Sequence, residues 1–125
     1  MKTKKNNQSI KDCSKKILAV RDALDIFSGK WKIPIIGALI HFREMGFKDL
    51  QRTIDGITPK MLSKELKDLE MNQLITRTVL DTRPVTVIYA ITDYGETCQD
   101  IIYELYNWGV KHRQKIMHQT IEEKT

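Results

Sequence analysis

Residues whose types and spacing suit contacts with a nucleic acid gather on one short segment, residues 57–70. At about 100° per residue, Lys60, Lys64 and Lys67 fall on one side of a helix, and Ser63 lies at its edge. Lysine can donate hydrogen bonds to phosphate oxygens and to guanine, and serine can serve several bases. The segment therefore indicates DNA contact rather than catalysis.

The same segment carries the signals of a helix with a defined start and one buried face. Thr58 suits the N-cap position and Pro59 the first helical position, where a missing N–H costs nothing. Leu62, Leu66 and Leu69 form a narrow apolar stripe opposite the lysines. We therefore predict a helix over about residues 58–71 that buries its leucines and exposes its lysines.

The surrounding elements predict a winged helix-turn-helix. A short helix over residues 47–54 precedes the lysine-bearing helix across a turn that contains Gly56, which matches a helix-turn-helix unit. Two strands over residues 74–80 and 85–91 follow, with Arg83 in the turn between them. Thr92 is placed to cap a last long helix. The fold class is mainly α (α+β), with a two-stranded wing and a long C-terminal dimerisation helix.

Two further helices are predicted over residues 17–27 and 31–42, the first burying Ile17, Val20, Leu24 and Phe27. The last helix has a broad, aromatic apolar face, which we expect to pack on a second copy in a homodimer. The alternative is packing on the first helix of the same chain. The residues assigned to the dimer interface are Ile101, Leu105, Tyr106 and Trp108.

Length and charge indicate one domain with two basic ends. The 125 residues divide into a disordered basic tail (1–12), a domain (13–118) and a flexible end (119–125). The net charge of +5 comes from the ends, since residues 17–110 carry a charge of −2. The tail could attract phosphate or simply be solvated. Because no apolar run could cross a bilayer or serve as a signal peptide, we expect a cytoplasmic protein.

The cysteines and histidines form no metal-binding or catalytic pattern. Cys13 and Cys98 lie far apart, and the three histidines have no metal-ligand spacing, so we expect neither a metal nor a cofactor. Without a base paired to Cys13 or a glycine-rich phosphate loop, we expect no enzyme activity. Lys11, Lys15 and Lys16 near Cys13 would favour its thiolate. Cys13 is therefore either a redox sensor or an inert thiol.

The predicted DNA contacts divide into groove contacts and backbone contacts. Lys48 is placed to contact the DNA backbone, and Arg83 a narrow minor groove or a phosphate. Lys30 and Lys32, on either side of Trp31, could also reach phosphate. Each of these side chains could instead be only a solvated surface residue. The assigned set is Lys48, Thr58, Lys60, Met61, Ser63, Lys64, Lys67, Arg77 and Arg83.

Several stretches resemble the HxlR family of bacterial winged-helix regulators. They are Cys13, Leu-Asp-Ile-Phe-Ser-Gly-Lys-Trp-Lys at 24–32, Gly-Ile-Thr-Pro-Lys-Met-Leu at 56–62, Ile-Thr-Asp-Tyr-Gly at 91–95 and Trp-Gly at 108–109. The resemblance implies a homodimeric, MarR-like regulator of transcription that binds double-stranded DNA and catalyses nothing. In some members a cysteine at the position of Cys13 senses electrophiles or oxidants.

Two positions depart from the family pattern. Ser14 follows the cysteine where proline is usual, and Gly46 stands where arginine is usual, which removes one customary backbone contact. Two alternatives stay open at this point. A small-molecule effector, which nothing in the sequence identifies, could replace the cysteine as the input. The same fold could also serve as a protein-interaction module without DNA.

Overall fold

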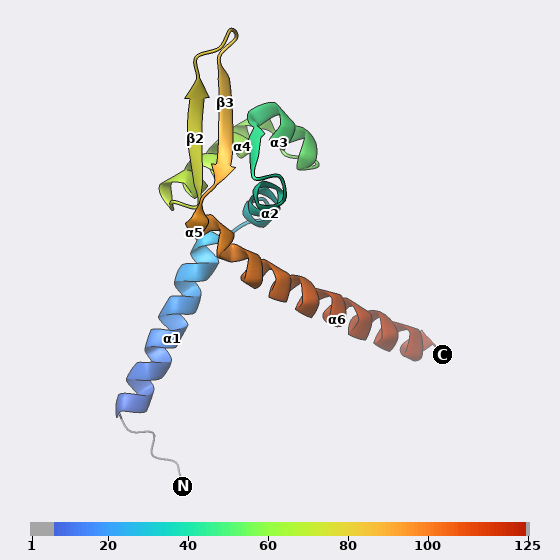
Figure 1. Cartoon of the computed structure of the whole chain (residues 1–125). Coiled ribbons are helices and arrows are strands. Elements are labelled where there is room, and N and C mark those ends of the chain that lie inside the picture. Colours follow the sequence, from blue (N-terminus) through green and yellow to red (C-terminus); the bar gives the residue numbers. More distant parts are fainter. Residues whose placement is uncertain (1–6, 125) are drawn as a thin grey trace.

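The computed structural model describes residues 7–124, and the side chains of residues 7–118. Figure 1 shows a small body from which a β-hairpin projects in one direction and two long helices in others. The elements in chain order are α1 (Asn7–Ile26), α2 (Lys32–Phe42), β1 (Glu44–Gly46), α3 (Phe47–Thr53), α4 (Pro59–Met71), β2 (Ile75–Leu80), β3 (Thr86–Ile91), α5 (Asp93–Glu96) and α6 (Cys98–Lys124).

The core of the body is formed by α2, α3, α4 and the base of the sheet. The predicted leucine stripe of α4 is confirmed, because Leu62, Leu66 and Leu69 are completely or almost completely buried. α2 is the most apolar helix and contributes Ile35, Ile36 and Leu39 to the same core. Burial of these side chains removes apolar surface from water and so holds α4 against α2.

The sheet has three antiparallel strands in the order β1-β3-β2, whereas the sequence predicted only the two strands of the wing. β1 pairs with residues 88–90 at the base of the hairpin, and β2 pairs with β3 along its whole length. The distal part of the wing is therefore two-stranded, as predicted. β1 was missed because three residues are too few to show an alternating pattern.

The first helix differs from its prediction in length and burial. α1 begins at Asn7, so residues 7–12, which were assigned to a disordered tail, are helical. Ile17, Val20 and Leu24 were predicted to be buried but are exposed in the single chain, whereas Phe27 from the same predicted face packs against the core. α1 and α6 leave the body in different directions, so the single chain does not bring these helices together along their length (Figure 1). Residues 1–6 of the predicted tail lie outside the described residues.

The predicted last helix is divided into two. Thr92 caps α5 as predicted, since its hydroxyl accepts a hydrogen bond from Gly95 N at 2.8 Å. α6 then starts at Cys98 and continues to Lys124, so the backbone of residues 119–124 is helical where a flexible end was expected. In the described part of the chain, no helix combines the length and the apolar character that crossing a membrane requires.

Candidate nucleic-acid interface

The start of α4 is built as the sequence predicts. Thr58 precedes the helix in an extended conformation, and its hydroxyl accepts a hydrogen bond from Met61 N at 3.2 Å. This bond satisfies one of the backbone donors that a helix start leaves unpaired. Because the leucine stripe faces the core, the side chains of Lys60 and Lys64 are exposed on the outer face.

A groove joins this outer face to the wing. Ser63, Lys67 and Glu70 line it from α4, Arg77 from β2 and Tyr89 from β3, around a volume of about 370 Å³. The groove therefore brings together three of the residues predicted to contact DNA. They are Ser63 and Lys67 from α4 and Arg77 from the wing. Two cationic side chains and one carboxylate give this groove a net positive charge.

Other predicted contacts lie outside this groove. Arg83 is exposed in the turn at the tip of the wing, and Lys48 is exposed in the first turn of α3. Met61 is 38% exposed on α4, and Thr58 is exposed although its hydroxyl serves the helix cap. The structure thus leaves all nine predicted DNA-contacting side chains accessible and brings three of them together.

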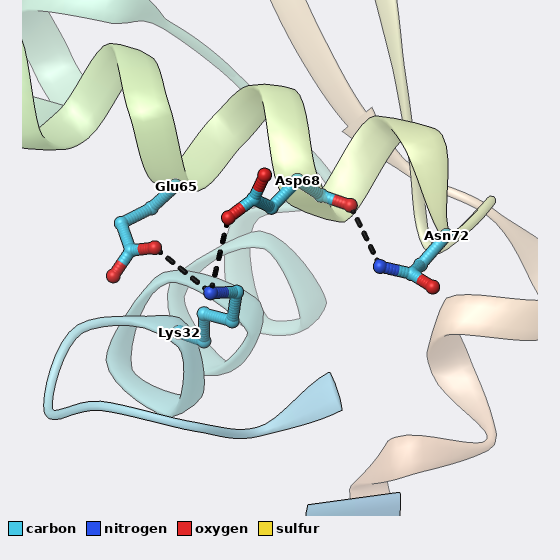
Figure 2. Close-up of polar contacts among 4 residues, drawn as sticks. All are labelled: Lys32, Glu65, Asp68 and Asn72. Carbon is cyan, nitrogen blue, oxygen red and sulfur yellow. Dashed lines mark hydrogen bonds and ion pairs between the residues drawn. The ribbon is translucent and has the colours of Figure 1, made fainter. Parts of the chain in front are cut away.

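Lys32 was expected to be able to reach phosphate, and this expectation is wrong. The side chain is buried, and its Nζ lies 2.9 Å from Glu65 Oε1 and 3.4 Å from Asp68 Oδ2 (Figure 2). Burial alone lowers the pKa of Lys32, but the hydrogen bonds and negative charges of Glu65 and Asp68 outweigh this and raise that pKa. Lys32 is therefore a charged group inside the protein, bonded to α4.

Lys30, the other lysine beside Trp31, stays at the surface. It is exposed, and its Nζ lies 4.6 Å from the centroid of the Trp31 ring, within the range of a cation–π contact. Trp31 is half-buried and packs against the core. Lys30 is thus the one of the two lysines whose charge faces solvent.

The need for a buried cation beside Glu65 could have been recognised in the sequence. Glu65 is three residues after Leu62 and four before Leu69, so it falls on the leucine stripe of α4 rather than on the lysine face. A charged residue in an apolar stripe needs a partner of opposite charge, because an unpaired buried charge is very costly. The sequence signal was present, but it did not identify which lysine pairs with Glu65.

The two cysteines differ sharply in accessibility. Cys13 is exposed on α1, and Cys98 is buried at the start of α6, where burial raises the pKa of its thiol. Because Cys13 lies within a helix, Lys16 is one turn away, whereas Lys11 and Lys15 project to other sides. Within residues 7–118, the structure shows no group of three or more metal-ligating side chains that could hold an ion.

The predicted dimer face of α6 is exposed to solvent in the single chain. Trp108 is 67% exposed, and its ring stacks on His112 with centroids 4.9 Å apart. The other residues assigned to this interface, Ile101, Leu105 and Tyr106, are also exposed. On the adjoining side of the helix, Ile102 packs against the core. An apolar surface of this width, uncovered in the single chain, is typical of interaction sites.

Comparisons with known proteins agree with this arrangement. A model of the HxlR-like helix-turn-helix family matches residues 26–117. The HTH-type transcriptional regulator BH0655 of Halalkalibacterium halodurans, itself uncharacterized, is 41% identical over 90 residues, which cover 72% of this chain and 80% of that protein.

Solved structures show the same fold. A protein assigned to the MarR family of transcriptional regulators from Porphyromonas gingivalis W83 superimposes with a TM-score of 0.67 and 38% identity, over 73% of this chain and 88% of that one. The redox regulator HypR in its reduced form gives a TM-score of 0.72 at 30% identity, over 78% and 96% of the two chains.

These relatives are regulators of transcription and not enzymes. The matched residues contain the whole helix-turn-helix, the wing and most of α6. The chain is therefore a transcriptional regulator with a helix-turn-helix DNA-binding domain, and it belongs to the HxlR-like helix-turn-helix family.

Proposed function

We propose that this protein binds a pseudo-palindromic operator as a homodimer and regulates transcription in the cytoplasm. α4 is the recognition helix, and its first turns enter the major groove, where Lys60, Ser63 and Lys64 contact base edges or phosphates. Arg77 and Lys67 hold the backbone beside them, and Arg83 reaches the adjoining groove or phosphate from the wing. The remaining proposed contacts are Lys48, Thr58 and Met61.

One observation carries this proposal: the groove that α4 shares with the wing. Side chains of Ser63, Lys67 and Arg77 line it together although they come from two elements. Lys60 and Lys64 are exposed on the same helix. A cationic groove between the outer face of a helix and a wing strand suits the phosphate backbone of DNA, so this geometry favours DNA over the protein-interaction module.

The homodimer is supported by the uncovered apolar faces of α6 and α1. Trp108 and Leu105 on α6, and Leu24 on α1, are more than half exposed in the single chain. A second copy would cover these faces and place two recognition helices about one turn of DNA apart, which suits a pseudo-palindrome.

We propose Cys13 as the input that changes DNA affinity in response to oxidants or electrophiles. Its exposure on α1 gives reagents access, and a redox regulator, HypR, is among the structural relatives. A small-molecule effector is the alternative input. An open groove of about 530 Å³ between α2 and α6, lined in part by Ile40, Tyr103 and Tyr106, offers it a place.

The experiment that tests this function is selection of genomic DNA fragments by the purified protein. The selection is done at physiological salt with excess nonspecific competitor, because the phosphate contribution is salt-dependent. Recovery of one pseudo-palindromic site would support the proposal. Recovery of random fragments only, in both reduced and oxidised protein, would contradict it and favour the protein-interaction module.

A further inference from the structure

We infer that Lys32 is a positioning residue for the recognition helix: it sets the orientation of α4 and thereby the protein's preference for its operator over other DNA. The inference rests on the proposed function, since it assigns a role in the same DNA contact. Lys32 itself contacts no DNA in this proposal, because its charge lies inside the protein.

The first observation is where the Lys32 ammonium lies. Figure 2 shows it beneath α4, bonded to Glu65 and Asp68 on successive turns of that helix. The two carboxylates are three residues apart and lie 2.9 and 3.4 Å from Nζ. Two hydrogen bonds of defined direction restrict rotation of α4 about its axis, whereas leucine contacts alone are non-directional.

The second observation is that α4 presents this pair and its DNA face from the same turns. Lys64 precedes Glu65 and Lys67 precedes Asp68 in the chain, and both lysines are exposed. A rotation of α4 that lengthens the Lys32–Glu65 bond therefore also moves Lys64 relative to the DNA. Because base contacts need good geometry and phosphate contacts are more tolerant, such a rotation lowers selectivity first.

The third observation concerns the loop that leads into Lys32, the first residue of α2. Gly29 has a φ of +79°, and a Cβ atom at this position would lie 3.8 Å from Glu65 Oε2. In the same loop, Trp31 Cη2 would lie 3.8 Å from a Cβ atom at Gly56, in the helix-turn-helix turn. The loop between α1 and α2 therefore approaches the helix-turn-helix at the turn and at α4. Because the loop approaches the helix-turn-helix at two places, Lys32 is better explained as an orienting residue than as part of an isolated ion pair.

The decisive variant is Lys32→Met/Glu65→Leu, which replaces the pair with apolar side chains of similar size. Such replacements of buried ion pairs usually keep or raise stability, and Asp68, whose side chain is 41% exposed, can be hydrated. We expect cooperative melting at or above the wild-type temperature. We also expect the ratio of affinity for a selected operator to affinity for random DNA to fall at least about tenfold, which corresponds to the loss of about one base contact.

Two controls separate positioning from other roles. Glu65→Gln keeps an acceptor for Lys32 and should retain most of the selectivity. Lys67→Met removes an exposed charge that the proposed function assigns to the DNA backbone. It should weaken binding to both DNAs alike and lower the salt slope, which is the slope of log affinity against log salt concentration, by about 0.9 for each phosphate that the variant no longer neutralises. The salt slope of Lys32→Met/Glu65→Leu should equal that of wild type, because this variant keeps every side chain that faces phosphate.

The outcomes are distinct. A folded double variant with wild-type selectivity would overturn the role of Lys32 and leave the proposed function intact. A double variant that does not melt cooperatively would overturn it as well, because the pair would then serve the fold. Wild-type protein without any selectivity would overturn the proposed function itself.

Discussion

The backbone of Gly95 lies so close to Leu74 that a Cβ atom on Gly95 would be 2.1 Å from the Leu74 carbonyl oxygen. The same oxygen accepts a hydrogen bond from the Thr92 hydroxyl at 2.9 Å. This contact joins the start of α5 to the residue before β2. It thereby fixes the position of the wing relative to the helix that leads into the proposed dimer face.

Gly95→Ala should destabilise the protein strongly, because the added methyl meets backbone rather than a flexible side chain. We expect a loss of at least about 2 kcal/mol in the free energy of unfolding, measured by urea titration. Gly37→Ala in α2 is the matched control, since a Cβ atom there meets nothing within 4 Å. It should be neutral or stabilise by up to about 1 kcal/mol. Equal stabilities of the two variants would contradict the close approach.

Lys60→Ala and Lys64→Ala should each weaken operator binding and lower its preference over random DNA. Removal of a base contact reduces discrimination between the operator and random DNA by about 1–3 kcal/mol. Removal of a phosphate contact lowers the slope of log affinity against log salt concentration by about 0.9. The measurement is a salt series of binding titrations on both DNAs. The control is Lys111→Ala, which removes an exposed lysine on α6. It should change neither the affinity for the operator nor the preference over random DNA. Intact operator binding by both α4 variants would remove α4 from the interface.

The two thiols should react at very different rates. A thiol reagent at neutral pH should label exposed Cys13 quickly and Cys98 only after unfolding, because burial blocks access to Cys98 and raises its pKa. Oxidant should change the DNA affinity of wild type and of Cys98→Ser but not of Cys13→Ser. If Cys13→Ser responds like wild type, Cys13 is not the sensor.

Trp108→Glu should dissociate the homodimer. Each copy loses an aromatic anchor worth about 1.5–3 kcal/mol and gains a charge on the face of α6. The dimer dissociation constant, measured by sedimentation, should therefore rise at least about 100-fold. Met71→Glu places the same charge at another exposed apolar residue, on α4, and should leave dimerisation unchanged. A monomeric wild type would refute the dimer directly.

The stabilisation from Lys32 should be lost only in alkaline solution. The folded-state pKa of Lys32 is raised, so the pair contributes fully below the unfolded-state lysine pKa of about 10.4. The contribution is lost as pH rises through the folded-state value. Wild type should exceed Lys32→Met by about 3 kcal/mol at neutral pH, because the variant leaves Glu65 buried without its partner. The gap should narrow only as the pH rises above about 10.5. A gap that closes already at about pH 8 would show that Lys32 is not held charged by the pair.

Local features of the chain were predictable from sequence because neighbouring residues decide them. Thr58 and Pro59 set the start of α4, and the spacing of Leu62, Leu66 and Leu69 identified its buried face. Thr92, which follows the hairpin, was likewise predicted to cap a helix, and it caps α5. These signals depend on helix periodicity and on capping, which act within about four residues.

The burial of α1 could not be predicted in the same way. Ile17, Val20 and Leu24 have the spacing of a buried face but are exposed in the single chain. Periodicity shows that a helix has an apolar face, and it does not show which molecule covers that face. The same limit applies to Trp108 on α6.

The order of residues along the chain was enough to specify most element types, the helix-turn-helix and its lysine face, since all of these follow from short-range spacing. Which distant residues meet depended on the folded chain. Folding paired Lys32 with Glu65 across 33 positions, added β1 to the sheet and placed Arg77 beside Ser63 and Lys67. Such contacts depend on the packing of whole elements, so a charge that looks free in the sequence can be buried in the fold, as Lys32 is.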